Sequence, residues 1–105
     1  MKLLNSWNFK TEEQILGLIL TDLTKDGVNE ILGYSNSGNI YIFSLEGKIL
    51  KKENITENSP IWCAKISEIT QDISNNLYVG ALDGLLRTFQ ITSSLEIIPL
   101  WAHQF

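Results

Sequence analysis

Asp22-Leu-Thr-Lys-Asp-Gly-Val-Asn-Glu-Ile31 leads through Gly-Tyr-Ser-Asn-Ser-Gly into Asn39-Ile-Tyr-Ile-Phe43. A later stretch, Glu68 to Phe89, has the same order of polar loop, apolar run, turn and aromatic-ended run. Four identities recur at a constant offset of 46 residues: Thr24 with Thr70, Asp26 with Asp72, Gly38 with Gly84, and Phe43 with Phe89. The chain therefore contains an internal repeat.

Each copy of the repeat contains short apolar or alternating runs separated by turn residues, which indicates strands rather than helices. The expected strands are residues 15–20, 30–34, 39–45 and 48–53 in the first copy, and 61–68, 76–81, 85–91 and 96–101 in the second. Four antiparallel strands with short turns, repeated at this period, are typical of propeller blades. The sequence predicts an all-β fold of two four-stranded antiparallel blades.

The outer-strand pattern, a charged residue followed by two aliphatic residues and then a large or polar one, occurs three times. It is found at Lys48–Glu53, at Glu96–Trp101 and also at the start of the chain, at Lys2–Trp7. The expected organisation is one unit over residues 1–105, with blade 1 at about 10–54, blade 2 at about 61–103 and an extra outer strand at 2–9. No linker or low-complexity segment interrupts it.

Three expectations concern burial. The continuous apolar run at 15–20 predicts a strand buried on both faces. Trp62, on the inner strand of blade 2, is expected to pack between blades. Cys63, in the apolar run Ile61–Ala64, is expected to be a buried small hydrophobic residue.

Composition excludes several functions. The net charge of −4 argues against nucleic acids and anionic membrane surfaces as partners. No stretch reaches the ~18 apolar residues of a membrane span. Cys63 is the single cysteine, so no internal disulfide is possible, and a reducing, cytoplasmic location is expected.

The segment Asp22–Gly33, followed by Ser37–Phe43, resembles the FG-GAP repeat. Gly84–Phe89 is similar to the third strand of FG-GAP, PQQ-like and WD40-like blades. FG-GAP repeats build the propellers of integrin α subunits and of many intracellular proteins. The resemblance implies a propeller architecture, but propellers have many unrelated activities, so it implies no single function.

The same resemblance implies a possible calcium loop. The family loop has the form Asp-x-Asp/Asn-x-Asp-Gly-x-x-Asp, and the matching side-chain positions here are Asp22, Thr24, Asp26 and Glu30, with Val28 at the backbone-carbonyl position. Thr24 and Glu30 depart from the family pattern. In the alternative interpretation, Asp22 and Asp26 accept backbone N–H groups within a turn. The second loop, with Glu68, Thr70, Asp72 and Asn76, lacks the glycine.

No catalytic constellation is visible. The sequence has no nucleophile motif, no metal-spaced His/Cys set and no phosphate-binding glycine loop. Cys63 and the only histidine, His103, are far apart along the chain. The expected protein is therefore not an enzyme and carries no cofactor other than a possible Ca²⁺.

Two blades cannot close a ring, since propellers have about four to eight. We expect the chain to be an interaction module that forms a closed propeller with copies of itself, as a trimer or tetramer, or with other propeller chains. Trp7 and Trp101, on outer strands, are the expected contact residues. The alternative is a ligand-binding propeller, either a glycan-binding lectin or a calcium-dependent adhesion module.

Overall fold

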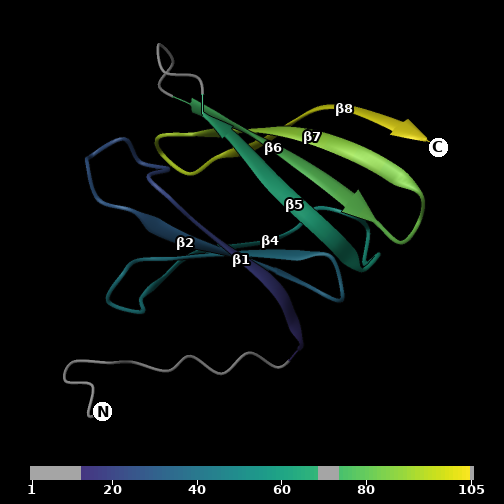
Figure 1. Cartoon of the computed structure of the whole chain (residues 1–105), viewed down its shortest axis with the longest axis horizontal. Coiled ribbons are helices and arrows are strands. Elements are labelled where there is room, and N and C mark those ends of the chain that lie inside the picture. The colour runs from purple at the N-terminus through teal and green to yellow at the C-terminus, as the bar shows by residue number, and fades with distance from the viewer. Residues whose placement is uncertain (1–12, 69–73, 105) are drawn as a thin grey trace.

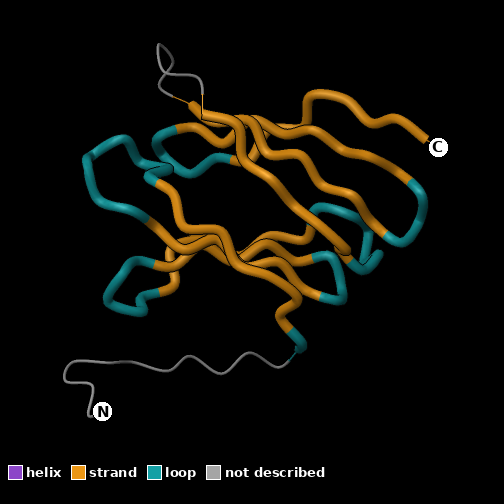
Figure 2. Tube along the Cα trace, in the orientation of Figure 1, coloured by secondary structure: helices purple, strands orange, loops and turns teal. Residues whose placement is uncertain are grey.

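The computed structural model describes residues 13–68 and 74–104, and all regular structure in these ranges is β-strand (Figure 1, Figure 2). No helix of the length and apolar character that a membrane crossing requires occurs within them. The first sheet has four strands in the order β1-β2-β3-β4. Their bounds are Ile15–Thr21, Glu30–Ser35, Asn39–Phe43 and Ile49–Asn54.

The second sheet repeats this arrangement in the order β5-β6-β7-β8. Its strands are Ile61–Glu68, Ser74–Ala81, Leu85–Thr92 and Ile97–Gln104. Every neighbouring pair in both sheets is antiparallel. The predicted all-β fold of two four-stranded antiparallel blades is confirmed, and we call the sheets blade 1 and blade 2. The outer strand predicted at 2–9 lies outside the described residues.

Strand register preserves the offset of 46 residues seen in the sequence. Ile19 pairs with Leu32 in blade 1, and the equivalent Lys65 pairs with Tyr78 in blade 2. A bulge between Ile15 and Gly17 recurs between Ile61 and Cys63. Because a one-residue slip would turn every side chain to the opposite face, this agreement shows that equivalent positions lie on equivalent faces of the two blades.

The two blades pack face to face, with β1 in contact with β5 (Figure 1). One apolar cluster joins them and includes Leu32, Ile40 and Ile42 from blade 1, and Leu77, Val79, Phe89 and Ile91 from blade 2. Outside this cluster, Lys25 Nζ donates to Asn75 Oδ1 across 2.8 Å, which ties the β1–β2 loop to β6. Burial of this shared face holds the blades together.

The expectation that the 15–20 run is buried on both faces was wrong. Along β1, Ile19 packs against the core, whereas Leu18 and Leu20 are 67% and 61% exposed. Leu18 pairs with Gly33, and its side chain lies over that glycine, so Leu18 is on the face of blade 1 turned away from blade 2. A continuous apolar run requires cover on both faces, and within residues 13–68 and 74–104 only blade 2 supplies it.

Gly38, in the turn between β2 and β3, is required for two reasons. Its φ of 88° is in the left-handed region that favours glycine. A Cβ at this position would lie 1.9 Å from Thr56 Oγ1 and 2.9 Å from the Ser59 carbonyl oxygen. Thr56 is buried and donates its hydroxyl to that carbonyl, so the turn packs tightly on the segment that connects the blades.

Gly38→Ala should lower the free energy of unfolding by about 3 kcal/mol or more, because it adds a clash with Thr56 to the left-handed strain. Gly84→Ala is the matched control. Gly84 has a φ of 83°, but a Cβ added there would meet no atom within 4 Å, so only the strain of roughly 1–2 kcal/mol applies. Urea denaturation of both variants measures the difference, and equal losses would contradict the packing described for Gly38.

Candidate functional site

The loop between β1 and β2 brings three carboxylates together. Asp22, Asp26 and Glu30 each offer one oxygen within 4.8 Å of the others. Carboxylate oxygens gathered around a glycine-containing turn are the kind of ligand set that Ca²⁺ prefers. The predicted loop therefore has the geometry expected for its carboxylates, while cation binding itself stays a prediction.

Hydrogen bonds show that the same carboxylates also organise the loop. Glu30, which is 5% exposed, accepts the N–H groups of Leu23 at 2.7 Å and Thr24 at 3.1 Å. Asp22 accepts the N–H of Gly27 at 2.8 Å, and Asp26 accepts that of Val28 at 2.9 Å. The alternative interpretation, in which both aspartates accept backbone N–H groups, is thus observed.

These hydrogen bonds do not use up the acceptor capacity of the loop. An ionised carboxylate has about four lone-pair sites, more than the bonds described use. The hydrogen bond from the Val28 N–H is the main cause that holds the pKa of Asp26 below its ordinary value, so this carboxylate stays charged. The Thr24 hydroxyl itself donates to Glu30 Oε2 at 3.1 Å. The donor set therefore fits an oxygen-coordinated cation, with Thr24 turned toward Glu30.

The second predicted loop cannot be compared with the first, because two of its four positions, Thr70 and Asp72, lie outside the described residues. Of its other two positions, Glu68 ends β5 and Asn76 lies within β6.

Glu13 forms a polar cluster that sequence reasoning missed. Its carboxylate accepts hydrogen bonds from the Ser37 hydroxyl, the Asn39 amide and, at 2.6 Å, the Tyr41 hydroxyl. Burial raises the pKa of Glu13, but hydrogen bonds from Ser35 and these three side chains lower it further, to about 2. The donors alternate along the start of β3, a spacing that could have indicated one shared acceptor.

Blade 2 has a different polar pair at the equivalent place. Arg87 and Asp83, which correspond to Tyr41 and Ser37, form a bidentate ion pair with contacts of 2.7 and 3.2 Å. The Arg87 hydrogen bond lowers the pKa of Asp83. The Asp83 N–H also donates to the Ser59 hydroxyl, and Ser59 corresponds to Glu13. The two blades therefore keep the position of this polar cluster but not its chemistry.

The expectation that Trp62 packs between the blades was wrong, because this side chain is 69% exposed. Trp62 is the extra residue of the bulge between Ile61 and Cys63, and a bulged residue is displaced from the regular alternation of the strand. Trp101, in β8, is 51% exposed and is accessible for the contact predicted for it. Trp7 lies outside the described residues.

Cys63 is exposed, so its expected burial was also wrong. Cys63 pairs with Gly80, and Ala64 next to it takes the buried position against blade 1. Cross-strand pairing puts Cys63, Gly80, Leu86 and His103 in one row across blade 2. Three strand spacings of about 4.8 Å each separate the thiol from the imidazole, which is too far for a nucleophile–base hydrogen bond.

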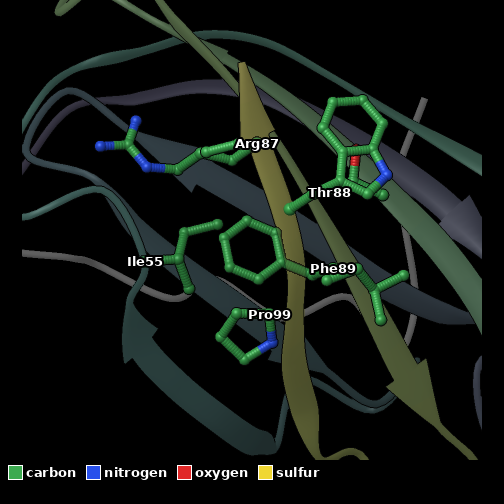
Figure 3. A pocket seen from close by; sticks show the side chains of 8 residues that line it. Ile55, Arg87, Thr88, Phe89 and Pro99 are labelled. Carbon is green, nitrogen blue, oxygen red and sulfur yellow. The ribbon is translucent and has the colours of Figure 1, made fainter. Parts of the chain in front are cut away.

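A pocket of about 300 Å³ lies where the blade connection meets β7 and β8. Ile55 points toward the Phe89 ring, with Pro99 beside it (Figure 3). The remaining lining residues are Arg87, Thr88, Leu100, Trp101 and Ala102. Since Arg87 is already paired with Asp83, the walls are mainly suited to an apolar group.

Two antiparallel four-stranded sheets that pack face to face through adjacent inner strands define this protein as part of a β-propeller. A solved structure with this fold is BBS1N in complex with ARL6DN, from a crystal soaked with lead. The TM-score is 0.68 at 18% identity, and the match covers 98% of this chain and 31% of that chain. No protein-family model and no curated protein matches. The chain thus spans about a third of that larger chain.

Glu13→Gln should weaken the pH dependence of stability in acid. The folded-state pKa of about 2 is below the ordinary value of 4.5, so the Glu13 contribution is complete above about pH 4.5 and is lost as the pH falls through about 2. Thermal unfolding between pH 5 and about 2 should show a shallower loss of stability in the variant than in the wild type. The exposed Glu57 supplies the control Glu57→Gln, which should leave the acid slope unchanged.

Proposed function

We propose that this chain is a non-enzymatic β-propeller interaction module, which completes a propeller with copies of itself or with other propeller chains. The observation that carries the proposal is the exposure of Leu18 and Leu20 on the inner strand of blade 1. Contiguous apolar surface at such a place favours association with another protein surface.

The blade count supports the same proposal. A closed propeller has about four to eight blades, and this chain supplies two. Copies alone would close a ring as a trimer or tetramer, whereas other propeller chains could supply the missing blades in a mixed assembly. The structurally similar BBS1N was solved in complex with a second protein, which is in keeping with a binding role for this fold.

The chemistry of the described residues supports a binding role over catalysis. Cys63 and His103 are too far apart to act together, and Arg87 is held by Asp83. The exposed Cys63 thiol supports a reducing, cytoplasmic location, since an accessible free thiol is prone to oxidation elsewhere.

Leu18→Lys should weaken association of the chain by at least about tenfold, because it places a charge in the surface that must be desolvated. Light scattering after size exclusion, over a range of concentrations, measures the effect. Leu82→Lys is the control, since Leu82 is 58% exposed but lies in the turn after β6. A wild-type chain that associates, and that associates equally strongly with Leu18→Lys, would contradict the proposal.

A second candidate function is a calcium-dependent, ligand-binding propeller of the FG-GAP type, such as an adhesion module or a lectin. The clustering of Asp22, Asp26 and Glu30 favours it. Thr24 and the backbone carbonyl of Val28 would complete the proposed ligand set. The exposed Trp62 and Trp101 would suit stacking on a sugar.

Millimolar Ca²⁺ should then raise the melting temperature, because a ligand that binds only the folded state stabilises it. Asp22→Asn with Asp26→Asn should remove the increase, whereas Asp83→Asn, outside the loop, should keep it. If the melting temperature of the wild type is the same in Ca²⁺ and in a chelator, the calcium candidate is wrong.

A further inference from the structure

Blade 1 and blade 2 each have one face that is turned away from their shared interface, and these two faces differ in chemistry. The internal repeat indicates what kind of surface would pack on each face. Leu18 and Leu20 of blade 1 correspond to Ala64 and Ile66 of blade 2 at the common offset. Ala64 is 3% exposed and Ile66 packs against the core, because blade 1 covers them. The exposed leucines therefore occupy positions that a preceding blade covers in the second copy.

The next strand continues the same correspondence. Ile31 and Gly33 in β2 correspond to Leu77 and Val79 in β6, both of which are fully buried against blade 1. We call the surface formed by Leu18, Leu20, Ile31 and Gly33 the receiving face. The equivalent residues of blade 2 form the surface that is buried against blade 1. The receiving face therefore lies where a blade would pack.

The observed interface also shows what a covering blade must present. Blade 1 covers blade 2 with aliphatic side chains, which include Ile19, Leu32 and Ile42. Leu32 and Ile42 are fully buried and pair with each other across β2 and β3. A blade that covers the receiving face in the same way therefore requires aliphatic residues at these three positions.

The free face of blade 2 does not meet this requirement. Lys65, Tyr78 and Thr88 stand where Ile19, Leu32 and Ile42 stand in blade 1. Lys65 is exposed. Thr88 is 2% exposed, and its hydroxyl has no hydrogen-bond partner in the described part of the chain. The Thr88 hydroxyl is buried already, but docking this face on the receiving face would bury the Lys65 charge, which the aliphatic receiving residues cannot pair.

Charged groups of both signs lie beside the receiving face, at Tyr41. Lys52 pairs with Tyr41 on the same side of blade 1, and its Nζ lies 5.5 Å from the centre of the Tyr41 ring. The Glu13 carboxylate accepts from the hydroxyl of the same tyrosine, so both charges are already held at Tyr41. Lys65 of a second copy would meet four residues of which none is acidic, and burial of its charge there would be uncompensated.

We propose that the receiving face binds a propeller blade of another polypeptide segment, with aliphatic residues at the positions of Ile19, Leu32 and Ile42, and that Lys65 prevents head-to-tail closure by copies of this chain. This inference rests on the proposed function and selects one of its two sources of blades. The partner is defined by its chemistry: an uncharged, aliphatic blade face with the register of blade 1.

A gain-of-function variant tests the inference. Lys65→Ile with Thr88→Val gives the free face of blade 2 aliphatic side chains at two of the three positions, leaves the Tyr78 ring at the third, and conserves side-chain shape at position 88. The wild-type chain should form no discrete trimer or tetramer. The double variant should increase its mass about two- to fourfold, to a discrete ring, in light scattering after size exclusion.

Two controls make the result specific. Adding Leu18→Lys to the double variant should return it to the wild-type mass, because the receiving face is then disrupted. Lys48→Ile, at an exposed turn position before β4, removes the same charge and adds the same side chain elsewhere, and should not produce a ring. Circular dichroism and thermal unfolding establish that each variant is folded.

Each outcome separates this inference from the proposed function. A wild-type trimer or tetramer that Leu18→Lys dissociates would support the proposed function and overturn the inference. A folded double variant with the wild-type mass would also overturn the inference. If Leu18→Lys left the association of both the wild type and the double variant unchanged, the proposed function itself would fail.

Discussion

Every propeller blade has two faces to cover, and this constraint governs the rest of the structure. One face of each blade is buried in the cluster that joins Leu32 and Ile42 to Leu77 and Val79. Burial of apolar side chains is the main favourable term in such packing, so the shared face determines how the blades lie. On the opposite face of blade 1, Leu18 and Leu20 remain exposed, whereas Tyr41 and Phe43 are buried.

The repeat is conserved in geometry more than in chemistry. Bulges, register and the two positive-φ turn glycines recur at one offset, because they determine backbone shape. The polar clusters differ: Glu13 collects hydroxyl and amide donors in blade 1, whereas Asp83 pairs with Arg87 in blade 2. The free faces differ as well, with leucines on one and Lys65 on the other. Equivalent backbones therefore carry two free faces of different chemistry.

The acidic loop illustrates how one set of carboxylates can have two roles. Glu30 is buried and holds the N–H groups of Leu23 and Thr24, so the loop is organised by its own hydrogen bonds. Asp22 and Asp26 also accept N–H groups but are closer to solvent. The hydrogen bonds orient the oxygens in advance, which would lower the ordering cost of any cation that bound there.

The sequence by itself determined the all-β class, the eight strands within a few residues, and the repeat that relates the blades, because these follow from alternation, turn residues and identities at a constant offset. It also located the acidic loop, since a short loop brings its own carboxylates together. Burial of particular residues was decided only by the tertiary structure. Trp62 is exposed because it lies in a bulge. Cys63 is exposed because its neighbour Ala64 takes the position that faces blade 1. The exposure of Leu18 depends on how many blades are present. These depend on contacts between segments far apart in the chain, which local patterns do not encode.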